Sequence, residues 1–255
     1  ARAGQFRGGC ASALAAHEEG LECGMDALHL SPIAHVATPY QDKFGVPRQS
    51  GLVPSAQGRL VFEPDYRREE AVRGLVEFSH LWIVFLFDQV KEEEVRLSVR
   101  PPRLGGNERV GVFATRSPFR PNRLGLSGCK LEAVDRECSD GPALLLSGVD
   151  LVNGTAVLDV KPYLPYSDCI AGAQARLAPA PPARLAVSIA EEVRAIFENL
   201  PDHQQAVIRE TLQWDARPAF HEGDRTYYLR VFDCDVAWEV RGDGCVVTGI
   251  VIVSE

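Results

Sequence analysis

The sequence predicts a mainly β protein, with a β-barrel or β-sandwich followed by a small C-terminal α+β domain. Between residues 95 and 160, short apolar stretches alternate with Gly, Pro and Asn, and a single helical pattern precedes them. This spacing is typical of barrels and sandwiches rather than of a βαβ sheet. An Ala/Pro-rich stretch then separates this region from two helical patterns. The chain has 255 residues, enough for one large domain or two modest ones.

The first 24 residues differ from the rest of the chain. They are rich in Gly and Ala, show no periodicity and end just before Met25, the single methionine. They also lack the apolar core of a signal peptide. We therefore expect residues 1–24 to be a non-native or disordered extension, and residues 25–170 to form the barrel domain.

The elements of the barrel domain follow from hydrophobic alternation and turn residues. A first strand is expected at 30–36, then a loop at 41–60 that is dense in Gly and Pro. Apolar residues on one face predict a helix at 69–78, and a continuous apolar run predicts a buried strand at 81–87. Further strands are expected at 95–99, 110–115, 124–134, 143–150 and 156–161. Asn153-Gly154 predicts a hairpin between the last two.

The C-terminal part begins after a linker. Residues 171–186 are rich in Ala and Pro, which is typical of a semi-rigid connection. Beyond it, Ser188 and Glu191 have the spacing of a capping box that opens a helix. A second helix is expected at 202–213, followed by strands at 226–232, 236–240 and 245–251. Residues 187–255 are therefore expected to form an α+β domain.

The charge is distributed unevenly along the chain. The net charge is −8, which by itself argues against a nucleic-acid partner. However, residues 96–123 carry seven arginines against one acid, a local charge of +6. Arginine suits bidentate binding of phosphate or carboxylate. A solvated basic face, or pairing with the acidic C-terminal half, explains the cluster equally well.

Several classes of site are disfavoured. The sequence contains no dinucleotide-binding, P-loop, HExxH or GxSxG motif. The seven cysteines form no CxxC pair and the six histidines show no metal spacing, so no metal is expected and a reduced cytoplasmic location is favoured. The longest apolar run has seven residues, against roughly 20 for a membrane span, so no membrane partner is expected.

Two segments remain as candidates for a functional site. The predicted buried strand at 110–115 would deliver Arg116 and its neighbours onto a loop stiffened by Pro118 and Pro121. In the strand at 156–161, alternation places Val157, Asp159 and Lys161 on one face. Asp159 and Lys161 are expected either to pair with each other or to bracket a zwitterionic ligand. Aromatic residues follow directly, in the run PYLPY from 162 to 166.

Four ordered blocks resemble the TrmO family, also called YaeB or VirR-like. These blocks are ATPYQDKFGVPRQSGL, GLVEFSHLWIVFLF, RPPRLGGNERVGVFATRSPFRPNRLGLS and DLVNGTAVLDVKPYLPYSD. The resemblance covers residues 31–168 and continues more weakly through the C-terminal part. It implies a single-sheet β-barrel that works as a homodimer. It also implies an S-adenosylmethionine-dependent enzyme that methylates N6 of N6-threonylcarbamoyladenosine at position 37 of tRNA, beside the anticodon.

By matching position, the resemblance implies three groups of residues. The cofactor pocket is expected at Pro39, Tyr40, Gln41, His80, Leu81, Arg116, Leu126, Asp159, Val160, Lys161 and Pro162. The catalytic candidates are His80, Asp159 and Tyr163. Contacts to the anticodon stem-loop are expected from Lys43, Arg48, Arg100, Arg103, Arg120, Asn122, Arg123 and Tyr166.

The resemblance also implies roles for single residues. Arg116 is expected to hold the cofactor carboxylate, Asp159 its amino group or ribose, and the backbone around Leu126 the adenine. Tyr40, Tyr163 and Tyr166 are expected to stack on the displaced base. Where the family usually has Asn-Pro-Ile-Gly, this chain has Asn-Arg-Leu-Gly at 122–125. Because the glycine is kept, the backbone path is expected to be unchanged.

Two other functions fit the same residues. The barrel would be a non-catalytic binder of tRNA or other RNA if its arginines and tyrosines only recognised shape and stacking. It would be an enzyme of a small phosphorylated metabolite if the arginines clamped a phosphate. The C-terminal domain is expected either to bind tRNA or to support a dimer, and its acidity favours the second.

Overall fold

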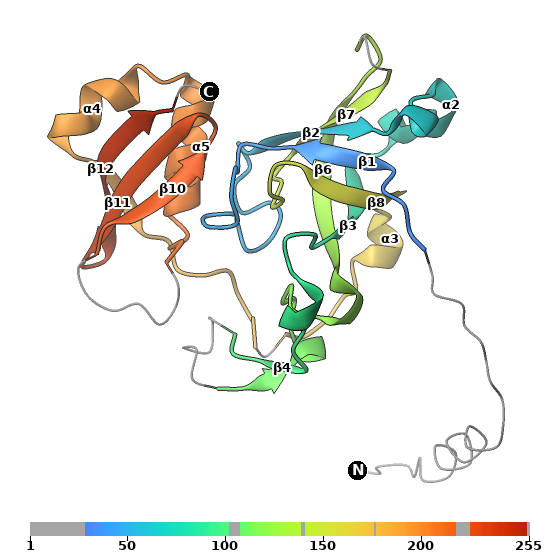
Figure 1. Cartoon of the computed structure of the whole chain (residues 1–255), viewed down its shortest axis with the longest axis horizontal. Helices are drawn as coiled ribbons and strands as arrows, with labels where there is room; N and C mark the ends of the chain where they lie inside the picture. Colours follow the sequence, from blue (N-terminus) through green and yellow to red (C-terminus); the bar gives the residue numbers. More distant parts are fainter. Residues whose placement is uncertain (1–28, 102–107, 139–140, 176, 218–224, 254–255) are drawn as a thin grey trace. The chain divides into compact units, whose positions relative to one another are not determined.

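The computed structural model describes residues 29–101, 108–138, 141–175, 177–217 and 225–253. The predicted extension at 1–24, Met25 and Arg103 lie outside them. Residues Pro32–Glu255 form one compact unit that contains a closed barrel, a four-stranded sheet and a small two-stranded sheet (Figure 1). No helix of the described ranges is long and apolar enough to cross a membrane.

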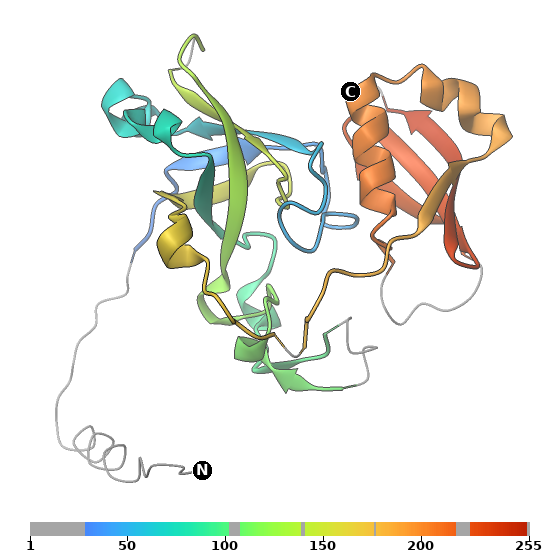
Figure 2. The same ribbon diagram turned by 180° about the vertical axis from the view of Figure 1, so that it is seen from behind.

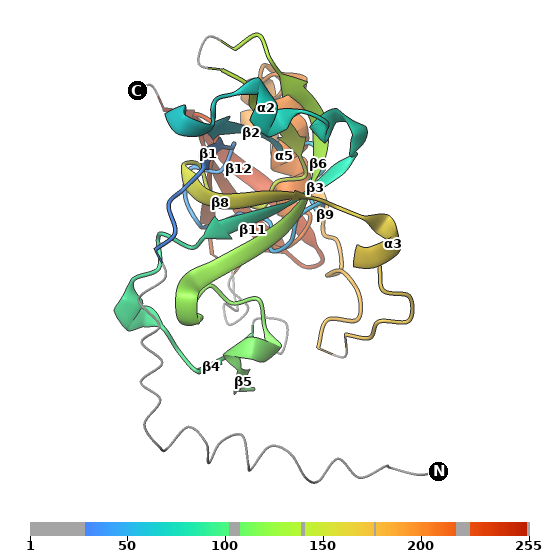
Figure 3. The same cartoon turned by 90° about the vertical axis from the view of Figure 1, so that its right-hand side faces the viewer.

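A closed six-stranded barrel confirms the predicted fold class. Its strands are joined in the order β1-β2-β7-β6-β3-β8, with every neighbouring pair antiparallel. They are β1 (Ala34–Ala37), β2 (Gln57–Phe62), β3 (His80–Leu86), β6 (Leu124–Asp135), β7 (Ala143–Ser147) and β8 (Thr155–Pro162). Figure 3 shows β8, β3 and β6 together, with the short helix α3 (Pro165–Asp168) beyond the end of β8.

Alternation along the strands separates the barrel interior from its outer face. In β3, Leu81, Ile83 and Phe85 are buried, whereas the residues between them are half-buried. Thus only one face of this strand is buried. Gly125 of β6 lies opposite Phe85, and a Cβ at Gly125 would come within 2.2 Å of the Phe85 ring. The interior is therefore packed too tightly for any larger residue at this position.

Two local predictions in the first half are wrong. The predicted loop at 41–60 includes the start of β2, whose alternating burial from Gly58 to Phe62 places it in the barrel wall. The predicted helix at 69–78 is two short turns, α2 (Glu69–Val72) and a 3₁₀ turn at Leu75–Glu77. Gly74 separates them with a φ of 88°, a left-handed conformation that interrupts a right-handed helix.

The hairpin predicted at Asn153-Gly154 is also absent from the described barrel. Strands β7 and β8 are not neighbours, because β7 pairs with β2 and β6 while β8 pairs with β1 and β3. Asn153 instead connects to the segment after β1: its side-chain oxygen accepts from the Thr38 amide at 3.1 Å, and its amide group donates to Gln41 at 3.1 Å. The Asn-Gly turn thus serves a long-range contact.

The C-terminal sheet has the order β10-β11-β12-β9. Its elements are β9 (Ala186–Ile189), α4 (Glu191–Glu198), α5 (Asp202–Leu212), β10 (Tyr227–Val231), β11 (Cys234–Arg241) and β12 (Gly244–Ile252). Both helices and the last three strands confirm the α+β prediction (Figure 2). The capping box is wrong, because Ser188 lies in β9, which pairs in parallel with β12, and α4 begins after Ala190.

Candidate active site on the outer face of the barrel

The outward-facing positions of β3, β6 and β8 form one surface. On β3 these positions are His80, Trp82 and Val84, which lie opposite Lys130, Gly128 and Leu126 of β6. On the other side, Trp82 and Val84 lie opposite Lys161 and Asp159 of β8. The outer face therefore gathers residues of three strands that are far apart in the sequence.

A bulge in β8 determines which of its residues reach this face. Val84 pairs with Asp159 but Phe85 pairs with Val157, so Leu158 is an extra residue between the two pairs. Val157 is consequently buried inside the barrel while Asp159 and Lys161 lie outside. The prediction that these three share one face is wrong. The predicted ion pair is present, with Lys161 Nζ 3.0 Å from Asp159 Oδ2.

A cavity of about 350 Å³ opens on this outer face, lined by Ser50, His80, Trp82, Arg116, Gly128 and Tyr163. His80, Arg116 and Tyr163 were expected in the site, and the structure brings these three together. Ser50, Trp82 and Gly128 were missed. The signal for Trp82 was its place two residues after His80 on the same strand, which gives both side chains the same face.

The aromatic side chains of the cavity are held in a fixed arrangement. The rings of Trp82 and Tyr163 lie 5.5 Å apart and are tilted by 52°, and His80 meets Tyr163 edge-on at 6.3 Å. The Trp82 indole donates to Asp168 Oδ2 at 2.9 Å, and the same carboxylate oxygen accepts from the Leu164 amide at 2.8 Å. The electron-rich ring faces suit a cation or a planar base.

Arg116 reaches the cavity from a loop rather than from a strand. Of the predicted strand at 110–115, only Val110–Gly111 is extended, and a 3₁₀ turn follows at Val112–Ala114. Val112 is buried but Phe113 is 75% exposed, so the segment lacks the two covered faces of a buried strand. The exposed Arg116 guanidinium donates to the Gln49 side chain, which positions it beside Ser50.

Two other arginines of this loop donate hydrogen bonds to backbone carbonyls. Arg120 donates to Thr115 at 3.2 Å, and Arg123 donates to Val90. Asn122 and Arg123 both have positive φ, at 63° and 51°. A proline ring fixes φ near −65°. The conformation of Arg123 is therefore closed to the proline of the family's Asn-Pro-Ile-Gly, and the expectation of an unchanged path is wrong.

A half-buried carboxylate that sequence reasoning missed belongs to Asp150. Asp150 accepts a hydrogen bond at 2.5 Å from Oγ of Ser127, which is buried on β6. Burial raises the pKa of Asp150 to about 6, against the opposing effects of the Ser127 hydrogen bond and the Arg116 charge. Asp150 is the first residue of the fourth block that resembles the TrmO family, but it was not among the residues expected in the site.

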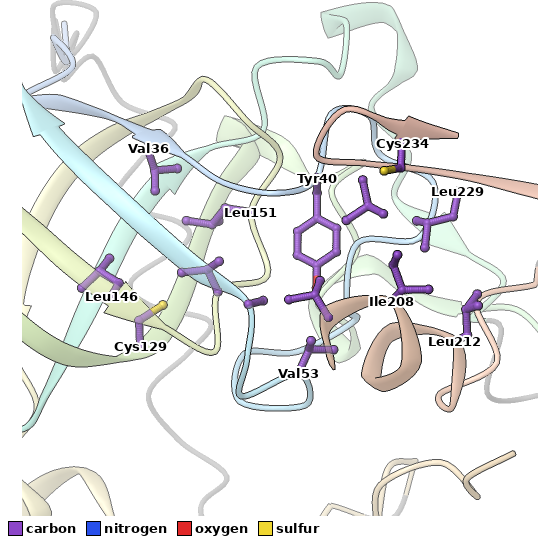
Figure 4. Close-up of a cluster of buried hydrophobic side chains, with 14 of the residues drawn as sticks. Val36, Tyr40, Val53, Cys129, Leu146, Leu151, Ile208, Leu212, Leu229 and Cys234 are labelled. Atoms are coloured by element: carbon purple, nitrogen blue, oxygen red, sulfur yellow. The ribbon is translucent and has the colours of Figure 1, made fainter. Parts of the chain in front are cut away.

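Some predicted cofactor residues have side chains elsewhere. Tyr40 is fully buried against the C-terminal helix α5, with its hydroxyl 3.3 Å from Thr211 Oγ1 (Figure 4). Pro39 is buried beside it, and the Gln41 side chain accepts a hydrogen bond from Asn153. This segment therefore has a structural role. Leu81 is fully buried in the barrel. The prediction of a stacking Tyr40 ring is therefore wrong, and a cofactor contact at Leu81 would have to come from its backbone.

The remaining cofactor candidates lie near the cavity residues along the strands. Leu126 is 54% exposed on the outer face, two positions from Gly128. Pro162 pairs with Leu81 at the end of β8, whereas Val160 packs against the barrel core. Asp159 also accepts a hydrogen bond from the Val160 amide at 2.9 Å. These positions leave Leu126 and Asp159 accessible beside the cavity.

The predicted RNA contacts fall into separate places. Lys43 and Arg48 line a second cavity of about 250 Å³, together with Arg217, and Arg48 donates to the Arg217 carbonyl at 3.1 Å. Arg100 and Asn122 are exposed, and Tyr166 on α3 is 88% exposed. Across the described ranges, no group of three or more His, Cys, Asp or Glu side chains is placed to hold a metal ion.

Comparison with known proteins identifies the family. The tRNA-methyltransferase O N-terminal domain matches residues 35–169, and the TrmO C-terminal domain matches residues 182–252. The chain is 45% identical over 227 residues to the tRNA (adenine(37)-N6)-methyltransferase of Escherichia coli (strain K12), covering 86% of this chain and 96% of that protein.

Two further relatives come from Pseudomonas aeruginosa. A protein named putative S-adenosylmethionine-dependent methyltransferase RcsF is 43% identical over 215 residues, covering 82% of this chain and 91% of that one. The crystal structure of TrmO from this organism superimposes with a TM-score of 0.72 at 35% identity, covering 88% of this chain and 98% of that chain. The chain therefore belongs to the TrmO family.

Proposed function

We propose that this chain transfers a methyl group from S-adenosylmethionine to N6 of N6-threonylcarbamoyladenosine at tRNA position 37. Methyl transfer from S-adenosylmethionine to tRNA adenine 37 is supported by the family. Its curated members include tRNA (adenine(37)-N6)-methyltransferases and proteins named as S-adenosylmethionine-dependent. One observation carries the assignment to this chain's own residues: the outer-face cavity that joins Arg116 to His80, Trp82 and Tyr163.

The cavity fits the cofactor in volume and in chemistry. Its volume of about 350 Å³ lies in the range of small-molecule sites. Arg116 provides a guanidinium fork for the methionyl carboxylate, and Trp82 and Tyr163 provide ring faces for the sulfonium or the adenine. When bound there, S-adenosylmethionine supplies an electrophilic methyl group.

In this reaction the chain mainly aligns the two reactants and accepts the proton that leaves N6. The transfer breaks a sulfur–carbon bond, forms an N6–carbon bond and releases the N6 proton. Holding the two reactants in line accounts for much of the rate. We assign acceptance of the proton to the ionisable groups on this face, His80, Asp159 or Tyr163, with solvent as the final acceptor. His80 lines the cavity, and its Nδ1 lies 2.9 Å from Ser79 Oγ.

The threonylcarbamoyl group explains the need for additional arginines. It carries a carboxylate, and an arginine of the 96–123 segment is proposed to bind it. Tyr166 presents an almost fully exposed ring close to the end of β8, where a base displaced from the anticodon loop would stack. The basic segment would meet the phosphate backbone.

We further propose that the chain works as a homodimer in the cytoplasm, with the barrel domain at 25–170 and the C-terminal domain at 187–255. The exposed apolar side chains of Leu124 and Leu126 on the outer face support a subunit contact next to the cavity. Sedimentation of the purified chain tests this: a dimer is expected, and a monomer at micromolar concentration would contradict it.

Nucleoside mass spectrometry tests the reaction itself. The chain is incubated with S-adenosylmethionine and tRNA, with and without prior threonylcarbamoylation. We expect a 14-Da increase only on N6-threonylcarbamoyladenosine. Methylation of unmodified adenosine 37 would preserve the family activity but refute the proposed substrate. Binding of tRNA without any methyl incorporation would instead support an RNA-binding barrel.

A further inference from the structure

Residues 48–56 form the cavity loop, which the barrel holds from one side. The Gly51 amide donates to the Gly148 carbonyl at 2.8 Å, and the Val149 amide donates to the Ala56 carbonyl at 3.3 Å. A Cβ at Gly148 would lie 3.1 Å from the Gly51 backbone, so the two segments approach closely. The barrel therefore fixes the middle and the end of the cavity loop.

Helix α5 and the residues after it hold the cavity loop from the other side. Glu210 accepts two hydrogen bonds from Ser55, one from its amide at 2.9 Å and one from its Oγ at 2.8 Å. The Trp214 indole donates to the Leu52 carbonyl at 2.6 Å. All four of these residues are half-buried, and Val53 between them lies in the buried cluster of Figure 4. The C-terminal domain therefore fixes this loop by specific hydrogen bonds as well as by packing.

The first half of the cavity loop reaches the proposed cofactor site. Ser50 lines the outer-face cavity, and the Gln49 side chain accepts a hydrogen bond from the Arg116 guanidinium. Gln49 is three residues from Leu52, the residue that Trp214 holds. Because each peptide unit is planar and leaves only two free dihedral angles per residue, the place of Leu52 restricts the places open to Gln49.

We propose that Glu210 and Trp214 are positioning residues for cofactor binding, which hold the cavity loop so that Gln49 keeps Arg116 where the methionyl carboxylate is received. This role presupposes the proposed cofactor site. Glu210 uses both carboxylate oxygens on Ser55, which fixes the orientation of that residue as well as its distance. The C-terminal domain would thus shape the cavity, a role other than the tRNA binding or dimer support expected from its sequence.

Calorimetric binding of S-adenosylmethionine to the full chain, well below its melting temperature, tests the inference. E210A should raise the Kd about 3–10-fold, because residues that do not touch a ligand change its binding by this order. E210Q keeps an acceptor oxygen for Ser55 and should restore most of the affinity. W214F keeps an aromatic ring but loses the hydrogen bond to Leu52, so it should also raise the Kd.

Steady-state kinetics separate cofactor binding from the chemical step. With cofactor and tRNA both saturating, kcat should change by less than about twofold in E210A and W214F, while the KM for the cofactor rises as the Kd does. A substitution that only unfolded part of the chain would instead lower kcat and the calorimetric stoichiometry, and would leave the Kd of the folded fraction unchanged.

Coupling to Gln49 tests the path to the cavity. Q49A removes the acceptor of Arg116, so E210A should cause no further loss of affinity in the Q49A background. E239A is the matched control, because Glu239 also accepts from a hydroxyl, Thr226 Oγ1 at 3.0 Å, but within the C-terminal sheet. The Kd of E239A should equal that of the wild type.

Wild-type affinity in E210A would overturn the inference, even with a lower melting temperature, since Glu210 would then only stabilise the chain. An equal loss from E210A with and without Q49A would also overturn it. If E210A does not fold, wild-type affinity in W214F overturns it. Absence of cofactor binding by the wild type would refute the proposed site itself, whereas binding that is insensitive to both substitutions refutes only the roles of Glu210 and Trp214.

Discussion

Tyr40 and Tyr163 each follow a proline, and both were expected in the site, yet they have opposite roles. Tyr163 lines the outer-face cavity beside Trp82. Tyr40 is fully buried between barrel residues such as Leu151 and C-terminal residues such as Ile208 (Figure 4). The difference comes from the partner: α5 and β10 cover Tyr40, whereas the outer face leaves Tyr163 accessible. Similar local sequences therefore acquire structural or functional roles through distant contacts.

The largest effect should come from removing the Tyr40 ring. We expect Tyr40→Ala to reduce the free energy of unfolding by about 3–5 kcal/mol, since a large side chain leaves a cavity in a packed core. Urea denaturation measures this loss. Tyr163→Ala should change stability by less than about 1 kcal/mol but reduce methyl transfer. If both variants lose stability alike, the distinction between the two tyrosines fails.

The next effect concerns the charge at the cavity. Arg116→Ala should raise the KM for S-adenosylmethionine by about 10–100-fold, because a hydrogen bond to a charged group contributes about 1.5–3 kcal/mol. Steady-state kinetics at saturating tRNA measure it. Arg136→Ala is the control, since Arg136 pairs with Glu69 at 3.0 Å on an exposed surface. An unchanged KM in Arg116→Ala would show that Arg116 does not bind the cofactor.

A smaller effect links stability to pH at Asp150. Its pKa is raised on folding to about 6 from 3.8, so the folded state binds the proton more tightly than the unfolded state. Stability associated with this group is therefore full below pH 4 and is lost as the pH rises through 6. Asp150→Asn should stabilise the chain by about 1–2 kcal/mol at pH 7.5 and have no such effect at pH 4. Denaturation at both pH values tests this, and destabilisation at pH 7.5 would contradict it.

The smallest expected effect lies in the aromatic part of the cavity. Trp82→Phe keeps a ring but loses the hydrogen bond to Asp168, so the KM for the cofactor should rise about 3–10-fold, equivalent to about 0.5–1.5 kcal/mol. Asp168→Asn keeps an acceptor oxygen and should have less effect. Kinetics with both variants measure the difference, and a larger loss in Asp168→Asn would show that the carboxylate acts in another way.

Much of the barrel was predictable because its strands alternate clearly. A continuous apolar run predicted a strand at 81–87, one residue later than β3, and His80 was expected in the site from the family resemblance. Arg116 and Tyr163 were predicted from the family resemblance, and the structure brings them to the same cavity. The 3₁₀ turn at Val112–Ala114 was missed because three apolar residues in a row fit a short strand equally well.

Residues that act through long-range pairing escaped prediction. The Leu158 bulge moves Val157 to the interior, and no local residue preference indicates it. Asp150 meets Ser127 because the antiparallel register of β6 and β7, with Lys130 opposite Ser147, continues past the end of β7, and Tyr40 is buried because α5 covers it. These facts depend on strand register and on the packing of separate segments.

Alternation, turn residues and four ordered motifs were thus enough to indicate a mainly β fold, the family and three residues of the cavity. Each of these follows from interactions between residues close in the chain or from a whole-segment pattern. The composition of the cavity was settled by the closed barrel, which places Gly128, Ser50 and Trp82 beside Arg116. Barrel closure joins residues separated by tens of positions, and a linear pattern does not encode which of them will meet.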